Sequence, residues 1–255
     1  MELLGTDEYI AALQNEGKLL VATARSADLD GPVPSCPEWV LRDLLSHIGF
    51  VHRWATGYVK DSLTEMVDEP DEEGVLAATV PDDQLVTWVA DGHAALVDAL
   101  WSAPDDLRCW TFMTAPSPLT FWARRQAHET TVHRVDAQLA AGARPDVLSS
   151  RFAADGADEL LLGFLARPGS KRYTKVGPGT VGFQATDADA SWTVKVSGTG
   201  LETKRGLGPV DLQVRARAED IYLLLWGRRR PEGLDLEGEA ALLDDWRKLF
   251  KVTWS

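Results

Sequence analysis

Hydrophobic residues recur at helical spacing through most of the first 140 residues of the chain. The stripe formed by Ile10, Leu13, Leu20 and Ala24 predicts a helix from about residue 6 to residue 26. Similar stripes predict helices at about 40–59, 82–102 and 122–141. Four amphipathic helices with this spacing are typical of an antiparallel helix bundle.

The connections between these helices differ in character. Residues 28–37 are rich in proline and glycine and predict a loop. Residues 61–81 are acidic and poor in hydrophobic residues, which predicts a solvated, mobile connection. The connection 104–118 is unusually apolar, because it contains Trp110, Phe112 and Met113, and we expect it to fold over another part of the protein.

The pattern changes after a candidate domain boundary at residues 143–147. A helical stripe at 152–165 is followed by strands predicted from alternation and turn signals at 180–186, 191–197, 201–204, 210–216 and 234–237. Further helices are predicted at 218–227 and 239–251. The chain is therefore predicted to be a two-domain α+β protein. A four-helix bundle at 1–147 precedes a small domain at 148–255, with an antiparallel sheet covered by helices on one face.

Composition and charge narrow the classes of function. The chain of 255 residues is 45% hydrophobic and 25% charged, as expected for a soluble globular protein. Its net charge of −13 argues against binding to nucleic acids or to anionic lipids. It has no apolar run long enough to span a membrane, and two cysteines are too few for a disulfide framework. We expect a cytoplasmic protein that binds neither nucleic acid nor membrane.

Ionisable residues interrupt the apolar faces of two predicted helices. In the helix at 122–141, Glu129, His133 and Asp136 lie on the apolar side, although such groups are rarely buried unless they are paired or bind a metal. Glu129 and His133 are four residues apart and project side by side. His47 lies in the middle of the apolar stripe of the helix at 40–59.

Two histidines and one carboxylate are a common ligand set for Zn²⁺ and other divalent first-row metals. The three candidates would leave a coordination position open, as in catalytic sites, and Asp136 could accept a hydrogen bond from an imidazole N–H. Alternatively, Glu129 and His133 are an ordinary helix pair that shares one hydrogen bond. His52 and His128 are expected to be structural or solvent-exposed, and His93 flanks the apolar stripe of the helix at 82–102 with no visible partner.

Other catalytic patterns are absent from the sequence. It contains no Gly-x-Ser-x-Gly motif, no phosphate-binding glycine loop and no dinucleotide fingerprint. The run 228–230 is three arginines after a predicted helix, which suits the negative end of the helix dipole. Arginines can alternatively bind a substrate carboxylate in a bidentate manner.

Four segments resemble the mycothiol-dependent maleylpyruvate isomerase family of actinobacteria: 33–47, 127–137, 218–229 and 236–243. The resemblance covers both halves of the chain. It implies a DinB-like bundle at 1–147 and a domain similar to sterol carrier protein 2 at 148–255. It also implies a divalent metal, normally zinc, held by His47, Glu129 and His133. An arginine linked to activity in the family corresponds to Arg228, although Arg229 could be confused with it.

The chemistry implied by the resemblance is cis–trans isomerisation assisted by a thiol. The metal would make mycothiol a thiolate, which would add to the double bond of maleylpyruvate, allow rotation and leave to give fumarylpyruvate. The expected partners are a small electrophilic substrate and a low-molecular-weight thiol, with the protein acting as a monomer or small homo-oligomer. Two alternatives are a mycothiol S-transferase that acts on other electrophiles and a non-enzymatic metal-binding or regulatory protein.

Overall fold

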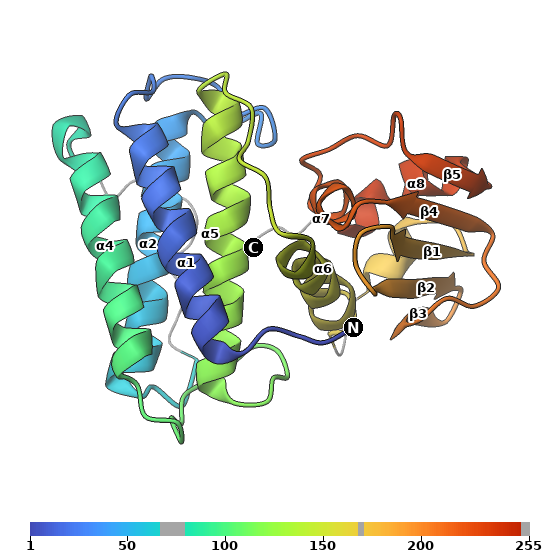
Figure 1. The fold of residues 1–255 in the computed structure, drawn as a ribbon, viewed down its shortest axis with the longest axis horizontal. Coiled ribbons are helices and arrows are strands. Elements are labelled where there is room, and N and C mark those ends of the chain that lie inside the picture. The colour runs from blue at the N-terminus through green and yellow to red at the C-terminus, as the bar shows by residue number, and fades with distance from the viewer. Residues whose placement is uncertain (67–79, 168–170, 251–255) are drawn as a thin grey trace. The chain divides into compact units, whose positions relative to one another are not determined.

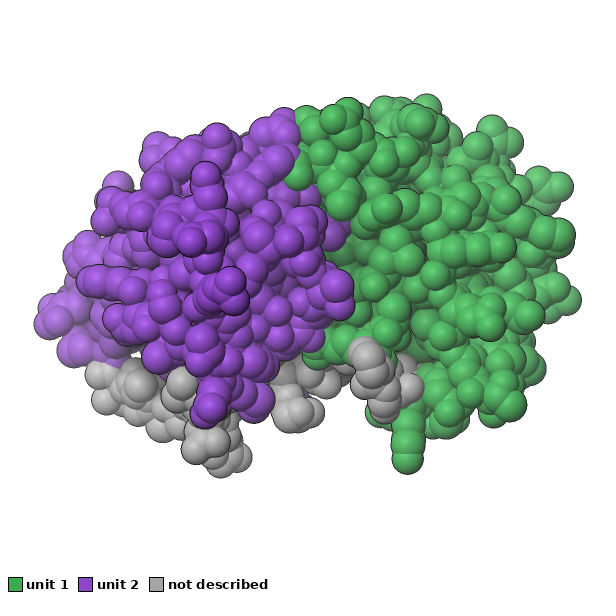
Figure 2. All heavy atoms as spheres, turned by 90° about the horizontal axis from the view of Figure 1, so that it is seen from below, with its two compact units in different colours: residues 1–4, 147–253 green, residues 5–146, 254–255 purple. Residues whose placement is uncertain are grey.

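The structure is a computed structural model that describes residues 1–66, 80–167 and 171–250. Most of the predicted acidic connection, residues 67–79, lies outside the described residues. Contacts divide the described chain into two compact units, coloured separately in Figure 2. One unit contains residues 5–146 and is called the bundle unit here. The other contains residues 1–4 and 147–250 and is called the sheet unit.

In the described part of the bundle unit, four long helices share a hydrophobic core, and Figure 1 shows them side by side. α1 (Thr6–Ala24) and α2 (Leu41–Asp61) each pack against both α4 (Asp82–Ser102) and α5 (Pro118–Ala140). The core combines residues from the predicted stripes, including Leu20, Leu44, Ile48, Leu85 and Val89. The predicted four-helix bundle is therefore confirmed.

The start of α5 lies four residues before the predicted one at residue 122, because local capping chemistry extends the helix. The Ser117 hydroxyl accepts the backbone N–H of Thr120 at 3.1 Å, and Pro118 occupies the first turn, where its missing N–H costs nothing. At the start of α2, the Asp43 carboxylate accepts the backbone N–H of Val40 at 2.9 Å. These caps fix where the two helices that carry the candidate site begin.

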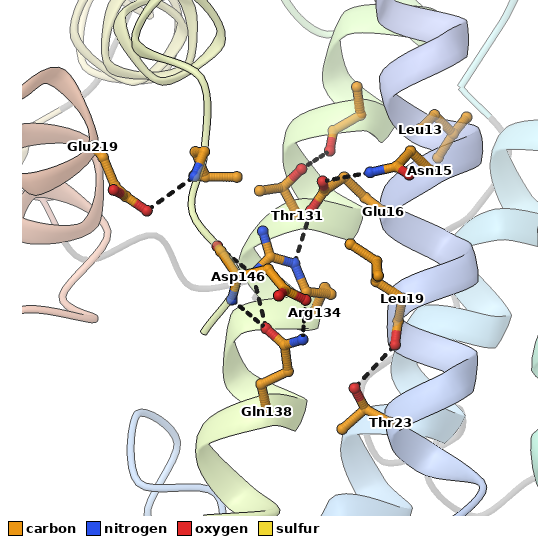
Figure 3. Close-up of polar contacts among 12 residues, drawn as sticks. Leu13, Asn15, Glu16, Leu19, Thr23, Thr131, Arg134, Gln138, Asp146 and Glu219 are labelled. Atoms are coloured by element: carbon orange, nitrogen blue, oxygen red, sulfur yellow. Dashed lines mark hydrogen bonds and ion pairs between the residues drawn. The ribbon is translucent and has the colours of Figure 1, made fainter. Parts of the chain in front are cut away.

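A buried polar cluster, called the Arg134 network here, joins α1, α5 and the segment that follows α5 (Figure 3). Arg134 Nε donates to Glu16 Oε2 at 2.8 Å, and Arg134 Nη1 donates to Gln138 Oε1 at 2.8 Å. Gln138 Nε2 donates to Asp146 Oδ2 at 2.7 Å. These contacts explain why the polar side of α5 is buried like its apolar side.

The apolar connection between α4 and α5 folds back onto the bundle. Its Trp110 and Phe112 lie 5.3 Å from Tyr58 and 6.4 Å from Trp54, measured between ring centroids. Trp122 Nε1 donates to the backbone carbonyl of Trp110 at 3.0 Å. Aromatic rings at these separations stabilise one another, so this connection completes the core at one end of α2 and α5.

The sheet unit begins with α6 (Ser150–Asp158), which continues into a π-helical turn, η1 (Glu159–Phe164). A short 3₁₀ helix, η2 (Arg172–Lys175), precedes the strands β1 (Gly179–Ala185), β2 (Ser191–Ser197), β3 (Gly200–Arg205) and β4 (Leu212–Ala216). The chain then forms α7 (Ala218–Leu225), β5 (Asp235–Gly238) and α8 (Ala241–Phe250). The predicted α+β architecture is confirmed (Figure 1).

The five strands are ordered β3-β2-β1-β4-β5, and the predicted antiparallel sheet is confirmed, with one parallel pairing within it. β1 and β4 are parallel, because the chain after β3 crosses the sheet before it forms β4. This crossover lies against Gly182, where an added Cβ would be 3.0 Å from Leu207 and 3.1 Å from Val210. Alternation identifies strands but does not specify their partners, so the pattern could not show this pairing.

No helix in the described ranges is both long and apolar enough to cross a lipid bilayer.

Candidate metal centre

His47 of α2 and Glu129 and His133 of α5 come together inside the bundle unit. Their potential ligand atoms all lie within 4.8 Å of one another. Glu129 Oε1 is 3.4 Å from His47 Nε2 and 3.2 Å from His133 Nε2. The three residues are only 8%, 4% and 7% exposed, respectively. We call this group the triad, and it combines the three residues that the sequence analysis selected as ligands.

The position of the proton on His133 shows why the triad needs a cation. Asp136 Oδ2 lies 3.1 Å from His133 Nδ1, and a carboxylate only accepts, so Nδ1 carries the proton. In a neutral imidazole, Nε2 then presents a lone pair, and that lone pair faces the Glu129 oxygen. Two acceptors at this distance require a cation between them, either a proton or a metal. The donor set therefore fits a divalent cation.

The pKa shifts of Glu129 and His133 also favour a positive charge between them. Burial alone would raise the pKa of Glu129, but hydrogen bonds from His133 and His47 and the charge of Arg125 bring it well below its ordinary value. Burial would lower the pKa of His133, but hydrogen bonds to Asp136 and Glu129 raise it above the ordinary value. Without a metal, a proton on His133 occupies the position that a cation would take.

Three residues around the triad were not selected by sequence reasoning. The Ser35 hydroxyl donates to Asp136 Oδ1, and Arg125 Nη2 donates to Glu129 Oε2 at 3.2 Å. The ring of Trp39 lies 5.1 Å from that of His47 and 6.4 Å from that of His133. The spacing of four residues between Arg125 and Glu129 was a readable signal, whereas Ser35 and Trp39 lie in a loop without periodicity.

The loop from residue 31 to residue 40 is held in a defined shape beside the triad. Pro32 and Val40 form an isolated antiparallel bridge, and the backbone N–H of Val33 donates to the carbonyl of Trp39 at 3.0 Å. The backbone N–H of Leu41, at the start of α2, donates to the carbonyl of Gly31 at 2.9 Å. Ser35 and Trp39 therefore come from a closed loop that is tied to the start of the helix bearing His47.

The other histidines of the bundle do not join the triad, and all are buried rather than exposed. His52 Nε2 pairs with the Thr130 hydroxyl at 2.8 Å, and His93 Nε2 donates to the carbonyl of Leu13 at 2.9 Å. Burial and the nearby His93 lower the pKa of His52 well below its ordinary value. The ring of His128 packs edge-on against Tyr9 at 6.3 Å. Their contacts are those of structural histidines.

Arg228 belongs to the sheet unit and follows α7. Its Nη1 donates to the backbone carbonyl of Trp226 at 2.7 Å. The neighbouring Arg229 is held by Asp220, with Nε 2.5 Å from Oδ1, and Arg229 Nη1 donates to the carbonyl of Arg230 at 2.6 Å. The carboxylate of Asp220 thus engages Arg229.

Two protein-family models match this chain, and together they span nearly all of it. The family model of the mycothiol maleylpyruvate isomerase N-terminal domain matches residues 10–138, and that of the MDMPI C-terminal domain matches residues 151–245. No curated protein matches the chain.

Among solved structures, a crystal structure of the mycothiol-dependent maleylpyruvate isomerase is 16% identical with a TM-score of 0.65. A histidine-to-alanine mutant of that enzyme is also 16% identical, with a TM-score of 0.66. Each match covers 94% of this chain and 98% of the other chain. At this identity the likeness establishes the fold.

Proposed function

The chain belongs to the mycothiol maleylpyruvate isomerase family, and on that premise we propose a metal- and mycothiol-dependent enzyme. Its thiol cosubstrate would add to an electrophilic double bond of a small substrate. The representative reaction is the cis–trans isomerisation of maleylpyruvate to fumarylpyruvate. The protein that gives the structural matches is named as a mycothiol-dependent maleylpyruvate isomerase, which supports this reaction class.

One observation carries the proposal: His133 Nε2 and His47 Nε2 face the same oxygen, Glu129 Oε1, at 3.2 Å and 3.4 Å. Three ligand atoms held this way would bind one divalent cation, normally zinc, and leave a coordination position open. A divalent cation in this position would supply Lewis acidity, which lowers the pKa of a thiol.

The protein's own residues would orient this chemistry. Asp136 keeps the proton of His133 on Nδ1, so that Nε2 stays available as a ligand. Ser35 holds the other oxygen of Asp136. The Trp39 ring provides an apolar wall beside both imidazoles, and a lower local polarity strengthens electrostatic effects at the triad. We propose that Arg228 binds a substrate carboxylate, because a guanidinium can donate two parallel hydrogen bonds to it.

In the proposed reaction the thiol adds to the substrate and is released unchanged. The thiolate sulfur forms a bond to one alkene carbon, and the π electrons move into the adjoining carbonyl as an enolate. The former double bond is now single and rotates. Return of the electrons expels the thiolate and leaves the trans isomer. Isomerisation therefore needs neither an oxidant nor a net proton transfer.

Metal analysis of the purified protein is the first test. We expect about one equivalent of zinc in the wild type and its loss in His133→Ala, because that variant removes one ligand atom. His128→Gln is the matched control, since it changes a buried histidine of α5 whose ring packs against Tyr9, and it should keep the metal. Metal retained in His133→Ala would refute the assignment of the triad.

The reaction is tested by following maleylpyruvate with and without mycothiol. Turnover to fumarylpyruvate that requires both mycothiol and metal is the expected result. Formation of a stable conjugate with an electrophile, without isomerisation, would replace the proposal by a mycothiol S-transferase. Loaded protein that does neither would contradict an enzymatic role of this kind.

A further inference from the structure

We propose that Arg125 is a positioning residue that limits Glu129 to one ligand oxygen and increases the acidity of a metal-bound thiol. The inference rests on the proposed function, because it concerns the same cation site. It assigns a chemical task to a buried arginine that lies outside the triad.

The geometry divides the two oxygens of the Glu129 carboxylate between different partners. Oε1 faces His47 and His133 at 3.4 Å and 3.2 Å, whereas Oε2 accepts from Arg125 Nη2 at 3.2 Å. The two imidazoles thus mark Oε1 as the ligand atom. Arg125 occupies the oxygen that would otherwise be available as a second ligand.

Burial strengthens the ion pair between Arg125 and Glu129, so that it can fix the orientation of the Glu129 carboxylate. Arg125 is 1% exposed and Glu129 is 4% exposed, so water does not screen the pair. Arg125 and Glu129 are four residues apart on α5, so the backbone fixes their separation. A carboxylate held on one oxygen by a rigid guanidinium has little freedom to turn and chelate a cation with both oxygens.

The charge of Arg125 has a second effect. The guanidinium offsets the negative charge of Glu129, so the carboxylate neutralises less of the charge of a divalent cation. A more positive centre binds a neutral thiol less readily than its thiolate, and the thiol pKa falls. Arg125 would therefore weaken metal binding somewhat while making the metal a better acid. Removal of Arg125 should therefore tighten metal binding. If Arg125 only supported the structure, its removal would loosen the site and weaken metal binding.

The same helix provides a matched control. Arg134 also forms a buried pair with a glutamate, Glu16, with Nε 2.8 Å from Oε2. No described contact joins the Arg134 network to the triad. Arg125 and Arg134 are nine positions apart on α5, about two and a half turns, so their side chains leave opposite sides of the helix and meet different neighbours. Arg134→Gln therefore removes a buried arginine from α5 without touching Glu129.

The test loads wild type, Arg125→Gln, Arg125→Lys and Arg134→Gln with Co²⁺ and uses readouts other than turnover. For Arg125→Gln we expect an altered d–d absorption spectrum and roughly tenfold tighter Co²⁺ binding in chelator competition, as removal of one nearby positive charge predicts. The pH midpoint for formation of the cobalt–thiolate absorption band with mycothiol should rise by about one unit. Arg125→Lys should restore most of this shift, and Arg134→Gln should match the wild type.

Weaker Co²⁺ binding by folded Arg125→Gln, or an unchanged spectrum and thiol midpoint, would overturn the inference and leave the metal site intact. Failure of the wild type to bind any divalent metal would instead overturn the proposed function itself. If Arg125→Gln does not fold, a crystal structure of the metal-loaded wild type decides. One oxygen of Glu129 on the metal and the other on Arg125 is the expected arrangement, and both oxygens on the metal would refute it.

Discussion

Two buried polar clusters share helix α5, and they differ in how their donors and acceptors are matched. In the Arg134 network, each contact pairs an N–H donor with a carboxylate or carbonyl oxygen (Figure 3). In the triad, His133 Nε2 and His47 Nε2 both face the same oxygen of Glu129. The contacts of the first cluster match donors with acceptors without an added ion, whereas the triad needs a proton or a metal ion between its acceptors. Burial of polar residues therefore does not mark a functional site, but a mismatch of acceptors does.

The largest expected effect is on the free energy of unfolding when the Arg134 network is broken. Removing one partner of a buried ion pair leaves an uncompensated charge and costs about 3–5 kcal/mol. Arg134→Met should lower the free energy of unfolding by this amount in urea denaturation, while the metal content of the folded protein stays at the wild-type level. The double variant Glu16→Met/Arg134→Met should recover part of the loss. Loss of metal from folded Arg134→Met would show that the clusters are coupled.

A smaller effect is expected from the residue that sets the proton position in the triad. Asp136→Asn replaces an acceptor with an amide that can donate to Nδ1, which would move the imidazole proton to Nε2 and block the ligand atom. Loss of such an outer partner typically weakens metal binding by about 10–100-fold. Chelator competition measures this change. Asp146→Asn is the control from the Arg134 network and should leave metal affinity unaltered.

The smallest expected effect is on the pH dependence of the unfolding free energy of the metal-free protein. Two histidines with opposite pKa shifts contribute to it. His52 has a lowered folded-state pKa, so its contribution to stability is present above its unfolded pKa of about 6.5 and is lost as the pH falls towards the folded value. His133 has a raised pKa, so its contribution is complete below about 6.5 and is lost as the pH rises through the folded value.

In the pH range below about 6.5, His52→Gln should therefore flatten the pH dependence of the unfolding free energy. The slope removed is at most about 1.4 kcal/mol per pH unit, because one proton is involved. Urea denaturation of the metal-free proteins at several pH values measures it. Parallel curves for wild type and His52→Gln would show that His52 does not titrate on unfolding in this range.

The sequence predicted much of this arrangement because helical periodicity determines which residues face inward. His47, Glu129 and His133 interrupt apolar stripes, so their helices direct them into the core, and the structure brings them together. Their role as ligands remains a proposal. Ser35 and Trp39 were missed because the loop that carries them has no periodicity, and their positions depend on the backbone bridge between Pro32 and Val40.

The sheet shows a second limit of prediction from sequence. The strands were predicted within two residues of their observed bounds, because alternating burial is a local property. The parallel pairing of β1 with β4 was not predicted, because it depends on where the chain crosses after β3. The crossover lies close to Gly182, where an added Cβ would press against Leu207 and Val210, and this contact is visible only once the sheet is assembled.

The position of the triad in the chain has a further consequence for the bundle. His47 and Glu129 are separated by 82 positions, so a bound cation would close a long loop between α2 and α5, as a disulfide does. The stability of the fold would then depend on metal supply. A free metal concentration of 100 times the dissociation constant would add about 2.7 kcal/mol to the unfolding free energy. Metal scarcity would therefore reduce the amount of folded protein as well as its activity.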